Sequence, residues 1–129
     1  GDCYMCAGGL PNGGGAQLSD MVRAARDMQK WLHIYNTERI KTGKPRFEAR
    51  IGIHRGPVVA GVVGSKKFAF DIWGDTVNIA ARIEQAGEGG KINISGEAYE
   101  LIRDSFPCTY RGKIAAKNKG EIDMYFVDN

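Results

Sequence analysis

The stretch that decides the fold runs Phe70-Asp-Ile-Trp-Gly-Asp-Thr-Val-Asn-Ile-Ala-Ala-Arg82. Its apolar start belongs to a strand predicted over residues 68–72, and Trp73-Gly74 breaks that strand. Asp75 follows at the position where a short polar side chain caps a helix, so a helix is predicted over residues 76–85. A strand that turns at a glycine into a capped helix is therefore the centre of the predicted fold.

The predicted helix has an apolar face and a polar face. Apolar residues at three- and four-residue spacing give it a core-facing stripe of Ile79, Ile83 and Ala86. Asn78 and Arg82 are four residues apart and share a face outside that stripe. The planar donor fork of arginine suits phosphate oxygens, and asparagine can donate to a ring oxygen or to a developing phosphorane. Spacing alone favours the simpler interpretation, a solvated polar helix face.

Hydrophobic periodicity and turn residues predict the elements on both sides of this unit. In chain order they are a strand over 3–10, a helix from 18 that ends before Gly43, a hairpin of strands 47–53 and 58–63, a strand over 91–95, a helix over 97–103, and a hairpin of strands 109–114 and 122–127. Strands and helices are mixed without strict alternation. This order indicates an α+β fold with helices on one face of a mixed, largely antiparallel sheet.

Bulk properties indicate one globular domain and exclude several classes of partner. The chain has 129 residues, 43% of them hydrophobic and 26% charged, with a net charge of +3. That charge is too weak to indicate nucleic acid, and no apolar run approaches the roughly 18 residues of a membrane span. Three cysteines make no closed disulfide framework, which fits a reducing cytoplasm. A start at Gly1, without initiator Met or signal peptide, predicts an excised or processed piece.

Three common motifs are disfavoured by their details. Gly56 and Gly61 have the spacing of a phosphate-binding P-loop, but Val62 stands where that loop needs a lysine. Cys3 and Cys6 have C-x-x-C spacing, but a zinc site needs a second ligand pair that the sequence lacks. An RNA-binding ferredoxin-like sheet is disfavoured because no predicted strand carries its aromatic signature.

Three further charged residues each have a functional and a simpler interpretation. Asp71 ends an apolar strand, where a carboxylate can accept from an exocyclic amine such as that of adenine; an ordinary strand-end aspartate is the alternative. Lys117 and Lys119 lie at the tip of the last hairpin, where lysine can reach a triphosphate as a point charge. Spacing alone favours the ordinary strand-end aspartate, and lysines at hairpin tips are usually just solvated.

Separated blocks of sequence carry a family signature. In chain order they are Gly1-Asp-Cys-Tyr-Met5, Arg50-Ile-Gly-Ile-His-Arg-Gly-Pro-Val-Val-Ala-Gly-Val-Val-Gly64, the stretch from Phe70 to Arg82, Lys91-Ile-Asn-Ile-Ser95, Tyr110-Arg-Gly-Lys-Ile114, Lys117-Asn-Lys-Gly120 and Tyr125-Phe-Val127. Together they closely resemble the catalytic domains of class III adenylate and guanylate cyclases. The resemblance implies a ferredoxin-like α+β fold and identifies residues 1–129 as a partial class III nucleotidyl cyclase catalytic domain.

The resemblance also implies an activity. Such enzymes cyclise ATP or GTP in clefts between two chains, as a homodimer or with a paired cyclase domain. Two Mg²⁺ or Mn²⁺ ions activate the ribose 3′-hydroxyl, which attacks the α-phosphorus and releases pyrophosphate, while the protein supplies positioning and charge. Adenylate cyclases typically have Asp at the base-selecting position and guanylate cyclases have Cys. Asp71 therefore predicts ATP as the substrate.

Motif positions carry family roles over to residues along the whole chain. They are the metal ligand Asp2, the phosphate-contacting Arg50, the base-selecting Asp71, Ile72 whose backbone lies against the purine, Asn78 and Arg82 for ribose orientation and transition-state stabilisation, and the triphosphate-binding Lys117. Asp2 and Arg50 are expected to face the substrate from one chain, and the others from its partner.

The chain departs from the family pattern at its start. The family's first metal aspartate and base-selecting lysine precede the position of Gly1, and both are absent, as are the first strand and its helices. With one of two metal carboxylates, the 129-residue chain is predicted to be inactive by itself. In the expected fold the absent strand lies in the centre of the sheet, so its absence leaves an open sheet edge. Another copy of the chain can complete that edge by exchanging elements.

The leading hypothesis is therefore an N-terminally truncated, cytoplasmic adenylate cyclase domain. A guanylate cyclase and a non-catalytic cyclase-like domain that binds nucleotide or supplies half a site are the alternatives. Asp2 coexists with Asn78 and Arg82 in one chain, which favours a complete homodimeric site over the non-catalytic domain.

Overall fold

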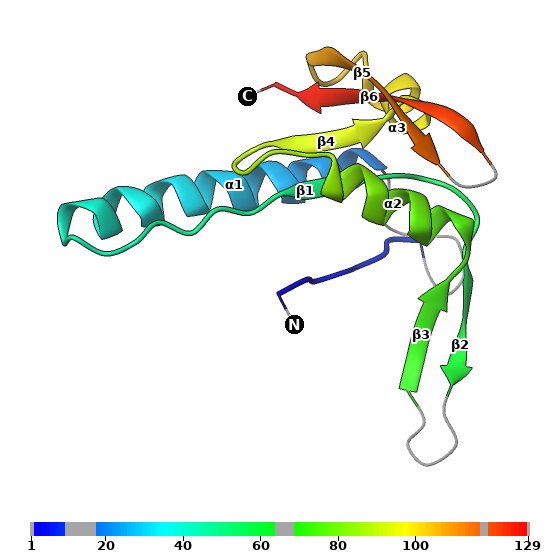
Figure 1. Ribbon diagram of the computed structural model, residues 1–129, viewed down its shortest axis with the longest axis horizontal. Helices are drawn as coiled ribbons and strands as arrows, with labels where there is room; N and C mark the ends of the chain where they lie inside the picture. The colour runs from blue at the N-terminus through cyan, green and yellow to red at the C-terminus, as the bar shows by residue number, and fades with distance from the viewer. Residues whose placement is uncertain (1, 10–17, 64–68, 117–118, 129) are drawn as a thin grey trace.

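The computed structural model describes residues 2–9, 18–63, 69–116 and 119–128, with the side chains of 60, 62–63 and 69–72 outside the description. The described residues form α1 Leu18–Lys41, β1 Ile51–Ile53, β2 Val59–Val63, β3 Ala69–Trp73, α2 Asp75–Gln85, β4 Ile92–Ser95, α3 Gly96–Ile102, β5 Cys108–Ala116 and β6 Gly120–Val127. A four-stranded sheet has the order β1-β4-β6-β5, with β1 and β4 parallel and the other neighbours antiparallel. β2 and β3 form a separate antiparallel ribbon that projects from the body of the molecule (Figure 1).

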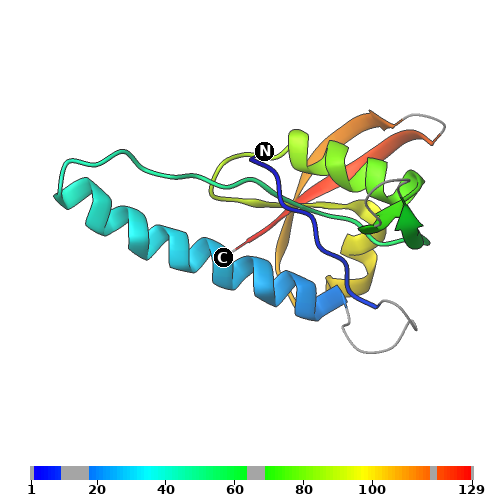
Figure 2. The same ribbon diagram turned by 90° about the horizontal axis from the view of Figure 1, so that it is seen from below.

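The helices cover both faces of the four-stranded sheet. On β4, Ile92 and Ile94 pack into the cluster that contains residues of α1 and α3, whereas Asn93 between them bonds to α2. Side chains alternate between faces along a strand, so α1 and α3 lie on one face and α2 lies on the other (Figure 2). The predicted α+β class is confirmed. The prediction that all helices lie on one face of the sheet is wrong, because α2 lies on the other face. An apolar stripe shows that a helix packs, but not on which face of the sheet it does so.

The sheet divides the apolar core into two clusters. The larger consists of Val22, Ala25, Ile53, Ile92, Ile94, Ala98, Ile102, Phe106 and Val127. The smaller consists of Ile79, Ile83, Ala116 and Met124. This smaller cluster holds α2 against β5 and β6, so it fixes the buried face of the helix at the centre of the sequence signature.

β1 approaches α2 through a glycine. A Cβ atom on Gly52 would lie 2.6 Å from the Cα atom of Glu84, so no larger residue fits without moving the helix. Ile51 and Ile53 face the larger core cluster on the other side of the strand. The Ile-Gly-Ile sequence therefore lets one short strand pack against α1 and α2 at once.

The predicted hairpin of residues 47–53 with residues 58–63 is wrong. β1 pairs in parallel with β4, and β2 pairs with β3. The connection between β1 and β2 is held at the start of α2, where Oγ1 of Thr76 donates to the carbonyl oxygen of Pro57 at 2.5 Å. The partner of β1 comes from a distant segment of the chain, and a local turn signal carries no information about that pairing.

The strand predicted from residue 3 to residue 10 is also wrong for the part of it that is described. Residues 2–7 have no regular secondary structure, and residues 2–8 are exposed. A strand needs a neighbour for its backbone hydrogen bonds, and no described strand pairs with this segment. Cys3, Cys6 and Cys108 are free thiols.

The remaining elements follow the sequence closely. α1 begins at Leu18 and ends before Gly43, whose φ of 72° suits only glycine at low cost. α3 begins after Ser95, whose Oγ accepts from the backbone N–H of Ala98 at 3.2 Å. The closing hairpin is longer than predicted, and its strands β5 and β6 supply one edge of the sheet.

Candidate active site

Helix α2 exposes the predicted catalytic pair. Asn78 and Arg82 are exposed, while Thr76, Ile79 and Ile83 on the opposite face are buried. Neither Asn78 nor Arg82 has a side-chain partner among the residues whose side chains are described. The prediction that the pair lies outside the apolar stripe is confirmed. The arrangement leaves a guanidinium and an amide available to an anionic ligand.

The start of α2 differs from the prediction. Asp75 is the first residue of the helix. The N-cap residue is Gly74, which has no side chain to make a cap hydrogen bond. Gly74 has φ 122° and ψ 179°, a backbone conformation that residues with a Cβ atom rarely adopt. The sharp change of direction from β3 into α2 therefore requires a glycine at the N-cap. Asp75, predicted to be the cap, is instead the first residue of the helix. The carboxylate of Asp75 remains in the first turn, where it is favourable to the helix dipole.

Asp71 and Ile72 lie in β3, in the ribbon that projects from the sheet. Their backbones pair with Gly61 and Ala60 of β2. Because β3 runs directly into α2, the predicted base-selecting position and the Asn78–Arg82 face belong to one continuous strand–helix unit (Figure 1).

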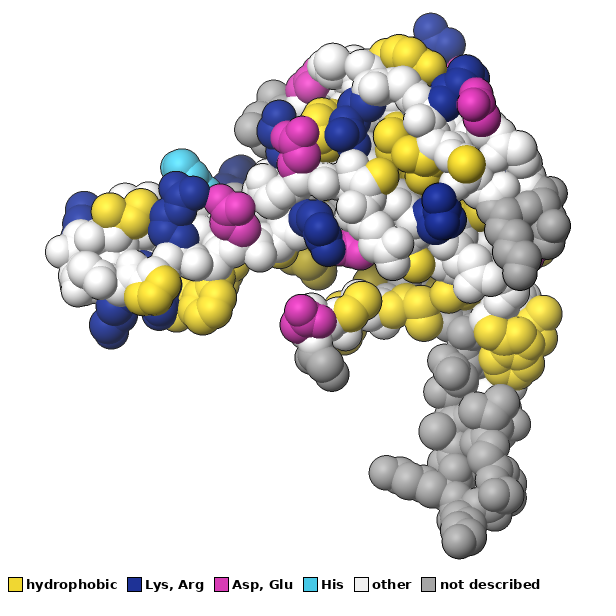
Figure 3. Space-filling view, viewed as in Figure 1, with side chains coloured by type: hydrophobic (Ala, Val, Ile, Leu, Met, Phe, Trp, Pro, Cys, Tyr) yellow, Lys and Arg dark blue, Asp and Glu magenta, His cyan; other side chains and the backbone are white. Residues whose placement is uncertain are grey.

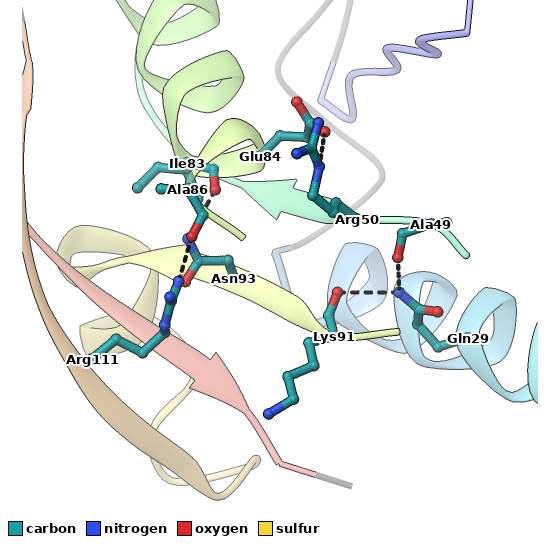
Figure 4. Close-up of polar contacts among 9 residues, drawn as sticks. All are labelled: Gln29, Ala49, Arg50, Ile83, Glu84, Ala86, Lys91, Asn93 and Arg111. Atoms are coloured by element: carbon teal, nitrogen blue, oxygen red, sulfur yellow. Dashed lines mark hydrogen bonds and ion pairs between the residues drawn. The ribbon is translucent and has the colours of Figure 1, made fainter. Parts of the chain in front are cut away.

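Arg50 lies beside α2, just before β1. Its Nε donates to Oε1 of Glu84 at 3.0 Å, and both side chains are partly exposed (Figure 4). Such a half-solvated pair contributes at most about 1 kcal/mol to stability. Its consequence is geometric, because it ties the predicted phosphate-contacting arginine to a residue two positions from Arg82.

The structure brings no other predicted residue to this place. Asp2 is exposed in the N-terminal segment, and Lys117 lies outside the described residues. No group of three or more His, Cys, Asp or Glu side chains that could hold a metal ion occurs in the described part of the chain. Asp2 thus offers a single carboxylate, and the described residues of one chain do not fit a pair of divalent ions.

The predicted site residues whose side chains are described, Asp2, Arg50, Asn78 and Arg82, are exposed. A shallow hollow lies between α1, the start of β4 and the end of β6, and is lined by Gln29, Lys91, Phe126 and Asp128 among others. It contains none of the predicted site residues. Val59 and Trp73 of the ribbon are 53% and 41% exposed, and apolar side chains gather at its base (Figure 3). The described side chains thus leave the Asn78–Arg82 face open.

Three residues around α2 were missed by sequence reasoning: Glu84, Asn93 and Arg111. Asn93 could have been found, because a polar residue between two isoleucines of a short strand contradicts an apolar pattern. Its amide Nδ2 donates to the carbonyl oxygen of Ile83 at 2.8 Å. Glu84 and Arg111 occur in ordinary polar surroundings in the sequence. Only the fold shows that Glu84, on α2, bonds to Arg50 and that Arg111 reaches the C-terminal end of α2.

Comparison with known proteins identifies the family of the chain. The sequence-family model of the adenylate and guanylate cyclase catalytic domain matches residues 1–129. The chain belongs to this family. An adenylate cyclase of Mycobacterium bovis is 37% identical over 127 residues, which cover 98% of this chain and 28% of the relative. The cyclase domain therefore spans just over a quarter of the length of that curated relative.

Solved cyclase structures share the fold. The guanylate cyclase domain of RhGC from Catenaria anguillulae, in complex with GTP, has a TM-score of 0.80 and 30% identity, covering 93% of this chain and 64% of that chain. The adenylyl cyclase CyaB from P. aeruginosa has a TM-score of 0.79 and 30% identity, covering 87% of this chain and 59% of that chain. Both kinds of cyclase thus resemble this cyclase domain. No described helix combines the length and the hydropathy that crossing a membrane demands.

Proposed function

We propose that this cyclase domain belongs to an adenylate cyclase, which converts ATP to 3′,5′-cyclic AMP and pyrophosphate. The observation that carries the proposal is the strand–helix unit of β3 and α2. It has Asp71 on β3, at the position that the family motif predicts to select the base, and exposes Asn78 and Arg82 on one face of the helix that follows.

The proposed roles follow from the chemistry of these groups. Arg82 donates to the phosphate oxygens whose charge grows in the transition state, and Asn78 orients the ribose. The O3′–Pα bond forms as the bond from Pα to the pyrophosphate oxygen breaks. Asp71 accepts from the exocyclic amine of adenine, and the backbone at Ile72 lies against the purine. Lys117 and Arg50 neutralise the triphosphate.

The proposal requires a second chain, either another copy or a paired cyclase domain. Asp2 and Arg50 would face the substrate from one chain and the α2 residues from its partner. Two features support this: Arg50, Asn78 and Arg82 are exposed, and the ribbon that leads into α2 exposes Val59 and Trp73. Divalent metal, Mg²⁺ or Mn²⁺, would supply charge at the phosphates, with Asp2 as one of its ligands.

The test is an assay of the gene product, with any residues that precede Gly1 or follow Asn129 retained. Purified protein with Mn²⁺ and ATP is expected to form cyclic AMP, and to prefer ATP over GTP. Asp71→Cys should lower the ratio of kcat/KM for ATP to that for GTP by about tenfold or more, because adenine loses its acceptor. Asp75→Cys, on the same strand–helix unit, is the matched control and should keep the ratio.

Other outcomes separate the alternatives. A preference for GTP in the parent protein would replace the proposal with a guanylate cyclase. A folded, dimeric protein that binds nucleotide and forms no cyclic product would support the non-catalytic cyclase-like domain. An unchanged nucleotide preference in Asp71→Cys would remove the base-selection argument alone.

A further inference from the structure

The C-terminal end of α2 is held by side chains from two strands of the sheet. The last carbonyl groups of a helix lack partners within the helix. Here the carbonyl oxygens of Arg82 and Glu84 accept from the backbone N–H groups of Ala86 and Gly87. Those of Ile83 and Ala86 accept instead from Asn93 of β4 and Arg111 of β5, at 2.8 and 2.7 Å (Figure 4).

Asn93 is a costly residue for the place that it occupies. Its side chain is fully buried between α2 and β6, where the neighbouring strand positions on β4 are isoleucines. Its Nδ2 also lies 3.3 Å from the sulfur of Met124, and its Oδ1 has no partner among the described residues. A buried amide is less favourable than an apolar side chain unless its hydrogen bond is needed. The bond that it makes fixes the residue immediately after Arg82.

Arg111 is aimed at the helix by an irregularity of β5. The register of β5 and β6 shifts between Tyr110 and Gly112, so Arg111 is the additional residue of a β-bulge. Its guanidinium carbon lies 4.0 Å from the centroid of the Phe126 ring, which holds the planar group in place. The side chain is only 19% exposed, and Nη1 reaches the carbonyl oxygen of Ala86. A cation at a helix C-terminus is also favourable to the helix dipole.

We propose that Asn93 and Arg111 are positioning residues, which set where Arg82 stands relative to the sheet and so to a substrate held at α2. The inference rests on the proposed function of α2. Neither side chain lies on the exposed Asn78–Arg82 face, so neither touches the substrate. They act by bonding to the carbonyl groups of Ile83 and Ala86 at the last turn of the helix, which carries Arg82. Placement matters because a shift of about 1 Å at a reacting group can lower the rate about a hundredfold.

The experiment uses the gene product and variants that keep the side-chain volume but remove the donor. Asn93→Leu retains a buried side chain of similar size, and Arg111→Met keeps a chain on the Phe126 ring. In both, kcat for cyclic AMP formation, counted per folded molecule, should fall about tenfold or more while KM for ATP changes less than about threefold. Arg111→Lys keeps a cationic donor and should retain more of kcat than Arg111→Met. Amide hydrogen exchange in α2 should rise in every variant that loses kcat.

Gln29→Met is the matched control. Gln29 Nε2 donates to the carbonyl oxygens of Ala49 and Lys91, at 2.9 and 3.1 Å, so it also joins a helix to strand ends (Figure 4). It lies on α1, across the sheet from α2, and its loss should leave kcat per folded molecule unchanged.

The outcomes distinguish this inference from the proposed function. A parent protein that forms no cyclic nucleotide overturns the proposed function, and the exchange data then judge the contact with α2. Unchanged exchange in α2, or a parent that is active while Asn93→Leu and Arg111→Met keep kcat within about twofold, overturns the inference. If Asn93→Leu does not fold, the comparison of Arg111→Lys with Arg111→Met decides.

Discussion

The two ends of α2 are built in opposite ways. At its N-terminal end the cap is Gly74, which makes no side-chain cap bond, and the long-range hydrogen bond is the one from Thr76 to Pro57. At its C-terminal end, side chains from β4 and β5 bond to the helix carbonyls, and β1 approaches so closely that only glycine fits. One end of the helix is thus fixed to the four-stranded sheet, and the other continues into a two-stranded ribbon.

This difference assigns different supports to different parts of the proposed chemistry. Arg82, proposed to stabilise the transition state, belongs to the turn that the sheet fixes. Asp71, proposed to select the base, belongs to β3, whose described strand partner is β2. A reacting group needs placement to within a fraction of an ångström, whereas a base-recognition group on a projecting ribbon can be adjusted by a second chain. The predictions below test whether the two ends are as unequal as their contacts indicate.

The largest expected effect comes from the approach of β1 to α2. In Gly52→Ala the new methyl group would lie 2.6 Å from the Cα atom of Glu84 and meet its backbone nitrogen. Backbone cannot give way as a flexible side chain does, so the free energy of unfolding should fall by about 3 kcal/mol. Chemical denaturation of wild type and variant measures the change.

Gly61→Ala is the control on the ribbon side of the comparison. A Cβ atom there would lie 3.4 Å from the Trp73 ring, which is an ordinary contact, so the cost should stay below about 1 kcal/mol. Equal losses in the two variants would mean that the sheet end of α2 is no more constrained than the ribbon.

The contrast between the ends also explains what the sequence could predict. The helices and the closing hairpin follow local periodicity and turn residues, and their positions were predicted closely. The four-residue spacing placed Asn78 and Arg82 on one helix face outside the apolar stripe, and that face is exposed. Pairings that depend on distant segments were missed, because the partner of β1 is β4, about 40 residues away in the chain.

The same limit applies to the site. Asn93 and Arg111 meet α2 from strands that follow it in the chain, and the bulge that aims Arg111 follows from the pairing with β6. Arg50 was predicted as a phosphate contact, and its ion pair with Glu84 joins residues 34 positions apart. A pattern within one segment indicates which face of that segment is polar. It does not indicate which other segment that face meets.

A smaller effect is expected at the ribbon end of α2. Thr76 is buried, and Thr76→Val keeps its shape while removing the hydrogen bond to Pro57. The free energy of unfolding should fall by about 1 kcal/mol, because one net hydrogen bond is lost. Amide exchange should rise at Asn78 and stay unchanged at Arg82, since the sheet still fixes the far end.

Thr37→Val is the matched control, because its Oγ1 donates to the carbonyl oxygen of His33 on the exposed surface of α1. Water replaces that bond, so the change should stay within about 0.5 kcal/mol. A rise in exchange along the whole of α2 in Thr76→Val would contradict the inequality of the two ends.

The smallest effect concerns pH and the connection from β1 to Pro57. His54 lies in this connection, with Nδ1 2.7 Å from Oγ of Ser95. Burial lowers the pKa of His54 below its ordinary value of 6.5; Glu97 opposes the shift and Lys119 adds to it. Folding therefore favours the neutral ring. The contribution of His54 to stability is complete above pH 6.5 and is lost as pH falls through 6.5 toward the lower pKa of the folded state.

The free energy of unfolding, measured between about pH 7.5 and about pH 5, should fall less in His54→Gln than in wild type. His33→Gln, at an exposed position of α1, is the control and should keep the wild-type slope. If His54→Gln also keeps that slope, protonation of His54 does not affect the stability of the connection at the ribbon end.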